Sequence, residues 1–340
     1  MTLESLYHQT KKHIDSVDFS RLWEGFAPLK FALYTDTECF FHGRYIPKTD
    51  DFLGNTAISF EGEMIAIWLV SGDPDPVVLA SKLIHEMFHG FQRLQGESRF
   101  PDEMEALFRY KYDEGNLSAK LEENRIIAGL LEQFDPPAFQ RLLELRKYRA
   151  NRFPYEYRYE SCIEQIEGTA QYVELMTIKQ LSPTLFTRET EHLKARMITE
   201  GNLLPVRIIC YDVGALLLLL LEENGVEYDK SFGDIPFSEG LLAEVAEYQG
   251  DIPQTMGEAV ESYFRKAEDT VGAGLLKNDL VAEGEFDLLG VNVYNAVYHK
   301  GYLISTFFVL FAEGGEQRVE YGDFLIETDE NRKMTRLFRL

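Results

Sequence analysis

The sequence HEMFH at residues 85–89 constrains the fold of this chain more than any other stretch. It lies in segment 76–94, whose apolar residues recur at helical spacing, and the Asp-Pro pairs at residues 73–76 are typical of a helix start. In a helix, His85 and His89 are one turn apart and point the same way, so both imidazoles can bind one metal ion. Burying two histidines and a carboxylate on an apolar helix is costly unless they share a partner. The pattern therefore predicts a metal site on a buried helix.

The chemistry that this spacing allows is hydrolytic. Zn2+ bound by two imidazoles and a third protein ligand keeps one tetrahedral position open, as in catalytic zinc sites. The metal lowers the pKa of a bound water toward ~7 and polarises a carbonyl group. Glu86 lies beside His85 and can accept the proton of that water without becoming a ligand. The alternative is a chance occurrence, in which the histidines are satisfied in the core or lie on a solvated face.

The composition excludes several other classes of protein. The formal charge of -23 argues against nucleic-acid or anionic-membrane partners, because both require clustered Lys and Arg. The three cysteines, Cys39, Cys162 and Cys210, form no CxxC pair and no disulfide framework, which fits a reducing compartment. The N-terminus has no apolar signal sequence, and the longest apolar run, 213–221, is about half the length of a membrane span. We expect a soluble cytoplasmic protein.

The residues before the HEMFH sequence indicate a helix or helix pair and then a sheet. Segment 3–25 has helical periodicity, and four β-rich runs follow at residues 31–34, 38–41, 57–60 and 64–70. The last two runs predict a hairpin that turns at residues 61–63. The strand that leads into the metal helix can offer its edge to an extended substrate, or it can be ordinary sheet.

Segment 98–150 is helical and heavily charged, and we expect its Arg and Glu residues to lie on solvated faces.

The next segment, 155–174, predicts a helix with acidic residues near one face: Glu160, Glu164, Glu167 and Glu174. An acidic stripe alone is typical of a solvated face. However, Gly168 costs a helix about 1 kcal/mol relative to Ala, so it indicates close approach of another backbone. Glu167 beside it is expected to face a packed helix.

The HExxH helix followed by a helix with the sequence EGxA resembles the gluzincin branch of zinc metallopeptidases, which includes the thermolysin-like enzymes and the zinc aminopeptidases. The resemblance implies that His85, His89 and Glu167 bind zinc and that Glu86 is the general base. Glu164, one turn before Glu167, is the best candidate to orient a ligand histidine and the main rival as third ligand. Glu160 is a weaker rival.

A third segment, residues 211–215, resembles the YxxGA segment of the zinc aminopeptidases. This resemblance implies that the Tyr211 hydroxyl donates a hydrogen bond to the oxyanion of the tetrahedral intermediate. The alternative is a helix-end tyrosine with its ring in the core. Arg207, one turn earlier, can reach the same cleft but ranks below Tyr211.

The pattern also departs from the known families. About 77 residues separate His89 from Glu167, more than in the well-known families, which implies a helical insertion at about 98–150. The GxMEN segment that anchors the substrate amino terminus in aminopeptidases is absent near residues 54–70, and the glycine and third histidine of the metzincins are absent after His89.

The C-terminal part of the chain turns from helical to β-rich. Helices are expected at about 239–249 and 255–268. Strands are expected at 286–293, 302–311, 318–326 and 335–340, with a tight turn at residues 314–315. These strands form a small β module or complete the N-terminal sheet.

These observations predict an α+β fold. Residues 1–280 are expected to form a zincin-like catalytic domain, with a mixed sheet packed on the HExxH helix, and residues 281–340 a β-rich C-terminal segment. The predicted function is zinc-dependent hydrolysis of peptide bonds in a peptide or protein substrate. The alternatives are a peptide- or partner-binding protein of the same fold with a structural metal, and a zinc hydrolase of a non-peptide amide. An intact Glu86 argues against a structural site, which has no use for a base.

Overall fold

Helix α2 (Pro76–Leu94) carries the HEMFH sequence in the computed structural model, which describes residues 2–340. Asp75 caps this helix, because its carboxylate accepts hydrogen bonds from the backbone N–H groups of Val77 and Val78. Pro76 occupies the first turn, where a missing N–H costs nothing. The helix predicted at 76–94 is confirmed.

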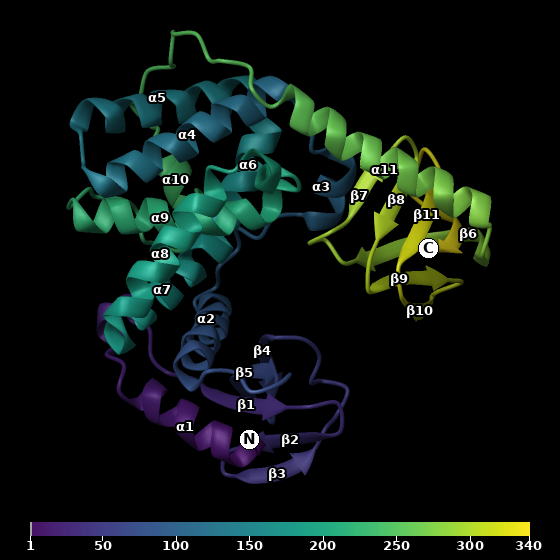
Figure 1. Cartoon of the computed structure of the whole chain (residues 1–340). Helices are drawn as coiled ribbons and strands as arrows, with labels where there is room; N and C mark the ends of the chain where they lie inside the picture. Colours follow the sequence, from purple (N-terminus) through teal and green to yellow (C-terminus); the bar gives the residue numbers. More distant parts are fainter. Residues whose placement is uncertain (1) are drawn as a thin grey trace.

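The described residues form an α+β fold, in which a body of helices connects two separate sheets (Figure 1). The N-terminal sheet is five-stranded, with the order β3-β2-β1-β5-β4. Strands β1 and β5 are parallel and the other neighbours antiparallel, so the sheet is mixed. Helices α1 (Leu3–Asp15) and α2 pack on it. Its strands are β1 (Lys30–Tyr34), β2 (Glu38–Phe41), β3 (Arg44–Pro47), β4 (Thr56–Phe60) and β5 (Glu63–Leu69).

The predicted hairpin is confirmed as β4 and β5, which turn at Glu61 and Gly62. Strand β5, which leads to α2, lies between β1 and β4 and has no free edge. Of the two alternatives for this strand, a substrate-binding edge or ordinary sheet, the structure shows ordinary sheet. The free edge belongs to β4, which pairs only with β5.

The helical body contains the chain between α2 and the C-terminal sheet. Helix α6 (Pro154–Ile163) continues through a π-helical turn, η2 (Glu164–Gly168), into α7 (Thr169–Leu181). Around it lie α4 (Glu114–Glu132), α5 (Pro136–Arg152), α8 (Pro183–Met197) and α9 (Val206–Glu223), with the short elements η1 (Phe19–Arg21), η3 (Glu200–Leu203) and α10 (Phe237–Gly240). The helix predicted at 239–249 is wrong, because only α10 forms there and turns follow it.

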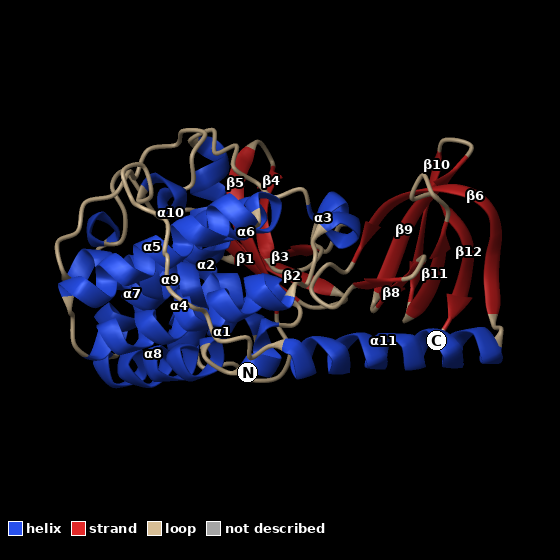
Figure 2. Ribbon diagram, turned by 90° about the horizontal axis from the view of Figure 1, so that it is seen from above, coloured by secondary structure: helices blue, strands red, loops and turns tan. Residues whose placement is uncertain are grey.

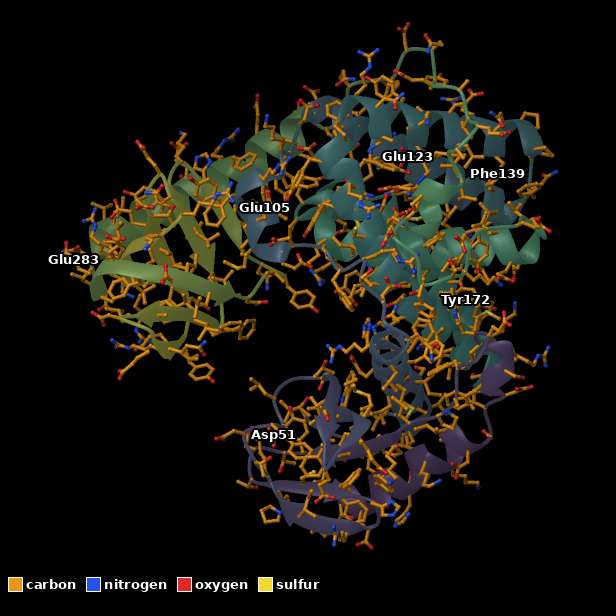
Figure 3. All side chains as sticks on the ribbon, turned by 180° about the vertical axis from the view of Figure 1, so that it is seen from behind. Asp51, Glu105, Glu123, Phe139, Tyr172 and Glu283 are labelled. Carbon is orange, nitrogen blue, oxygen red and sulfur yellow. The ribbon has the colours of Figure 1, made fainter. Side chains whose placement is uncertain are left out.

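The sequence suggested that the charged residues of segment 98–150 lie on solvated faces. This expectation is wrong for several of them. Four side chains of α4 and α5 are almost completely buried: Lys120, Glu123, Arg146 and Arg149. Arg149 pairs with Glu123 and Glu160, Lys120 with Glu160, and Arg146 with Glu164. Figure 3 shows Glu123 within the helical body. These pairs connect the predicted insertion to α6 and η2.

The C-terminal strands form a sheet of their own rather than completing the N-terminal one. This seven-stranded antiparallel sheet has the order β10-β9-β6-β12-β11-β8-β7 and its own hydrophobic cluster. Helix α11 (Gly257–Lys277) lies along it (Figure 2). The strands are β6 (Leu280–Val291), β7 (Val297–His299), β8 (Tyr302–Ser305), β9 (Phe308–Glu313), β10 (Glu316–Tyr321), β11 (Phe324–Thr328) and β12 (Met334–Arg339). We call residues 280–339 the C-terminal module.

The C-terminal module is connected to α2 through α3 (Glu103–Arg109), which follows α2 in the chain. Met104, Leu107 and Phe108 of α3 pack against the hydrophobic cluster of the module.

The two long predicted strands at 302–311 and 318–326 are each divided in two, the first at Phe307, whose φ is +70°. Among residues 2–340, no helix combines the length and apolar character that crossing a membrane requires.

Candidate metal centre

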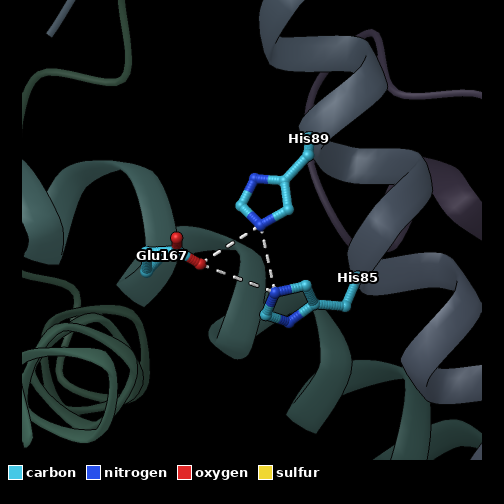
Figure 4. Close-up of side chains that lie close together, drawn as sticks. All are labelled: His85, His89 and Glu167. Carbon is cyan, nitrogen blue, oxygen red and sulfur yellow. Dashed lines mark hydrogen bonds and ion pairs between the residues drawn. The ribbon is translucent and has the colours of Figure 1, made fainter. Parts of the chain in front are cut away.

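The three residues expected to bind zinc lie together. His85 and His89 project from α2, and Glu167 projects toward them from η2 (Figure 4). The Nε2 atoms of the two histidines are 3.1 Å apart, and Glu167 Oε2 lies 3.2 Å from His89 Nε2 and 3.9 Å from His85 Nε2. Ligands about 2 Å from a tetrahedral zinc ion are roughly 3.3 Å from one another. The observed spacing fits one such ion.

Glu167 reaches the histidines because two glycines allow two helices to cross closely. A Cβ atom added to Gly168 would lie 2.7 Å from the Cα of Gly214 in α9, and one added to Gly214 would lie 2.8 Å from the Cα of Gly168. The close backbone approach predicted at Gly168 is therefore confirmed. The crossing occurs at a π-helical turn, a rare conformation that is frequent at functional sites.

Both candidate ligand histidines have a polar partner beside their second ring nitrogen, a carboxylate for His85 and a hydrogen-bonded amide oxygen for His89. His85 Nδ1 lies 3.1 Å from Glu174 Oε2, and Lys82 Nζ lies 2.7 Å from the other oxygen of Glu174. His89 Nδ1 lies 2.8 Å from Gln92 Oε1. An acceptor at Nδ1 holds the proton there and leaves the Nε2 lone pair for a metal.

Gln92 is itself held in place. Its amide donates hydrogen bonds to the Ile166 carbonyl oxygen (3.0 Å) and the Thr169 hydroxyl (2.9 Å), so it joins α2 to the segment that carries Glu167. No role was expected of Gln92 or Glu174 from the sequence. Helical spacing was the available signal, because Gln92 is three residues after His89 and Glu174 is two turns after Glu167.

The structure corrects the expected role of Glu164. Its carboxylate pairs with Arg146 inside the helical body, while Glu174 occupies the position beside His85 that Glu164 was expected to take. Glu160, the weaker rival, pairs with Arg149 and Lys120. Glu167 is therefore the acid of this helix that lies between the two histidines.

The electrostatics of the cluster favour a cation. Burial would lower the pKa of His85, but Glu167 and Glu174 raise it to about 10. Burial would raise the pKa of Glu167, but His89, His85 and Arg207 hold it well below its usual range. Both shifts arise because two carboxylates face the imidazoles. A divalent metal ion supplies the positive charge that these carboxylates stabilise.

Tyr211 and Arg207 lie on α9 beside Glu167. Arg207 Nη2 is 3.2 Å from Glu167 Oε1, and its Nε is 2.8 Å from Glu103 Oε1. A third guanidinium nitrogen donates a hydrogen bond to the Tyr211 hydroxyl. Burial raises the pKa of Tyr211, so the hydroxyl keeps its proton and can donate it in a hydrogen bond. Arg207 thus contacts a candidate ligand directly, closer to the centre than its ranking in the sequence analysis implied.

A cleft of about 530 Å³ opens onto the cluster. Glu86 lines it together with the two histidines and Glu167, whereas the next residues of α2, Met87 and Phe88, are buried in the core. Tyr211 also lines the cleft, which favours the site role over the alternative of a core tyrosine. The N-terminal sheet contributes Asn55, Thr56 and Trp68, and the C-terminal module contributes Tyr294.

Tyr294 brings the C-terminal module into the site. Its ring centre lies 4.6 Å from the Arg207 guanidinium, and its hydroxyl lies 3.4 Å from that of Tyr211. A cation over an aromatic face is stabilised by the ring, so Tyr294 helps to fix the side chain that contacts Glu167. No local sequence pattern pointed to this residue.

Replacing Glu174 by Ala is expected to weaken zinc binding by about 10- to 100-fold, because His85 loses the acceptor that fixes its tautomer and ring orientation. Competition with a chromophoric chelator measures the effect. Glu223→Ala is the matched control, because Glu223 is an exposed acid on α9 that pairs with Lys179. Equal zinc affinity in Glu174→Ala and wild type would contradict the assigned role.

No family model, curated protein sequence or solved structure matches this chain. The functional assignment therefore depends on the geometry and chemistry of the cluster.

Proposed function

We propose that this chain is a zinc-dependent metallopeptidase with a zincin-like catalytic domain of the gluzincin type. The observation that carries the proposal is the convergence of His85, His89 and Glu167, from α2 and η2, at the spacing of a tetrahedral site. Two imidazole nitrogens and one carboxylate oxygen are a donor set that suits zinc. With three protein ligands, a tetrahedral zinc ion would keep one position for water or substrate.

The residues around the cluster have separate roles in the proposed reaction. When bound, zinc supplies a Lewis acid that activates water and polarises the scissile carbonyl. Glu86 accepts the proton of the water and passes it to the leaving amine. Tyr211 donates a hydrogen bond to the oxygen of the scissile carbonyl as negative charge develops there. Arg207 holds Glu167 from the side opposite the histidines.

The shape of the cleft supports a peptide substrate. Thr56, at the start of edge strand β4, lines the cleft, and among residues 2–340 β4 has no second neighbouring strand, although its Ala57 carbonyl accepts a hydrogen bond from Arg93. An extended peptide can pair with such an edge through main-chain hydrogen bonds. The place of Glu86 in the cleft supports catalysis over binding alone, because a binding site does not require a base.

Metal analysis of the purified protein tests the proposal. Wild type is expected to hold about one zinc ion per chain after loading, and Glu167→Ala is expected to lose it. Glu164→Gln is the control, because Glu164 pairs with Arg146 rather than with a histidine. Zinc-loaded wild type is further expected to cleave members of a peptide library, and a chelator to stop the cleavage reversibly. A wild type that cannot be loaded, or a loaded wild type that cleaves no peptide, would contradict the proposal.

A further inference from the structure

Two of the three Lys and Arg side chains that line the cleft are paired with carboxylates. Lys82 pairs with Glu174, and Arg207 pairs with Glu103 and Glu167. Arg93 also lines the cleft, and no carboxylate of residues 2–340 lies within 4.0 Å of its guanidinium nitrogens. Its one hydrogen bond described here runs from Nη1 to the Ala57 carbonyl oxygen, at 2.5 Å. A guanidinium has five N–H donors, so most of this group remains available to a ligand.

Arg93 lies where a bound peptide would pass. It follows His89 by one turn of α2, and it reaches Ala57 in β4, next to Asn55 and Thr56 of the cleft wall. One helical turn rises about 5.4 Å, which equals roughly two residues of an extended peptide. A substrate held along β4 with its scissile bond at the cluster would therefore place a nearby residue at the guanidinium.

The charge balance of the cleft favours an anion at this place. Its lining contains three cations, Lys82, Arg93 and Arg207, and four carboxylates, Glu86, Glu103, Glu167 and Glu174. With both histidines counted as neutral ligands, these groups sum to minus one, and a bound divalent metal ion would bring the sum to plus one. The chain as a whole carries a charge of -23, so a metal-loaded cleft is a positive region on a strongly acidic protein.

We infer that Arg93 binds a carboxylate of the substrate about two residues from the scissile bond. The inference rests on the proposed function and adds a substrate class to it: peptides with an acidic side chain, or with a free C-terminal carboxylate, at that position. The planar guanidinium can bind a carboxylate through two parallel hydrogen bonds, which a Lys side chain cannot do.

Matched peptides test this inference. The two residues before and the two residues after the scissile bond are varied one at a time. At each position one peptide carries Glu and its partner carries Gln, and every peptide is also made with an amidated C-terminus. At one position, wild type is expected to prefer the carboxylate about tenfold in kcat/KM. The ratio of kcat/KM between the Glu and the Gln peptide is expected to fall to about one in Arg93→Gln and to be partly kept in Arg93→Lys. In Arg93→Glu, a peptide with Lys at the same position is expected to be preferred.

Arg125→Gln is the control for the loss of one positive charge, because Arg125 is an exposed residue of α4 that pairs with Glu200 outside the cleft. It is expected to keep the wild-type ratio. A second readout is the binding of fluorescent peptides to zinc-loaded Glu86→Gln, with and without Arg93→Gln. Weaker cleavage and binding of the amidated forms of both the Glu and the Gln peptides identify a C-terminal carboxylate, whereas a preference for Glu over Gln that survives amidation identifies an acidic side chain.

The outcomes separate this inference from the proposed function. A wild type that cleaves peptides without a carboxylate preference, or a preference that persists in Arg93→Gln, overturns the role of Arg93 and leaves the peptidase proposal intact. If no peptide is cleaved but binding to the Glu86→Gln variant depends on both the carboxylate and Arg93, the peptidase proposal fails and the carboxylate site stands. If neither cleavage nor Arg93-dependent binding is observed, both fail.

Discussion

Replacing Glu86 by Gln is expected to lower kcat/KM for a cleaved peptide by about a thousandfold, while the zinc content stays at the wild-type level. Gln has almost the same shape as Glu and can still contact a water molecule, but it cannot accept a proton at neutral pH. Loss of a general base costs about 10²- to 10⁴-fold in rate. Glu86 is expected to show an effect of this size because it lines the cleft beside both candidate ligand histidines.

The measurement combines steady-state kinetics with metal analysis of the same preparation. His89→Ala provides the contrast, because it is expected to lose activity and zinc together. Glu63→Gln is the matched control for the loss of a carboxylate, since Glu63 is an exposed residue at the start of β5 that pairs with Lys30. If zinc-loaded Glu86→Gln kept wild-type activity, another group would be the base, and Glu103 would be the first carboxylate of the cleft to examine.

Helix α2 could be predicted from the sequence because all of its signals are local. The Asp-Pro start, the apolar periodicity and the spacing of the two histidines all lie within residues 73–94. The packed position of Glu167 could be predicted for a related reason. The adjacent Gly168 lies inside a helix and therefore indicates a close neighbouring backbone, even when that neighbour is unknown. The structure identifies that neighbour as Gly214 of α9.

Other parts of the site depend on tertiary packing that one sequence does not reveal. In the structure Glu174 contacts His85, whereas Glu164 pairs with Arg146 inside the helical body, and the π turn at Glu164–Gly168 changes the residue spacing along this helix. Tyr294 reaches the cleft from a separate sheet. The order of the N-terminal strands also had to come from the structure, since the hairpin alone did not show that β4 rather than β5 forms the edge.

The buried charges of α4 and α5 were misplaced for a different reason. Helical segments rich in Arg and Glu are usually solvated, because an isolated buried charge is very costly. Here cations and carboxylates from three helices compensate one another: Lys120 and Glu123 from α4, Arg149 from α5 and Glu160 from α6. Such compensation is a property of the packed body and has no local signature.

Glu160→Ala is expected to lower the free energy of unfolding by about 3–5 kcal/mol, because it leaves Arg149 and Lys120 buried without their shared carboxylate. Burial alone would raise the pKa of Glu160, but Arg149 and Lys120 lower it to about 2, so the group is charged at neutral pH. Urea unfolding measures the change. The exposed pair of Glu122 and Arg141 gives the control, in which Glu122→Ala is expected to cost less than about 1 kcal/mol.

The same variant links the buried network to the metal centre. Helix α6 carries Glu160 and continues directly into η2, which carries Glu167. Zinc that binds only the folded chain stabilises it by mass action, so added zinc is expected to restore part of the stability lost in Glu160→Ala. It should restore nothing in Glu160→Ala combined with Glu167→Ala. If Glu160→Ala lowered the free energy of unfolding by less than about 1 kcal/mol, water or a shifted side chain would compensate the charge of Arg149. The buried network would then not hold η2 in place.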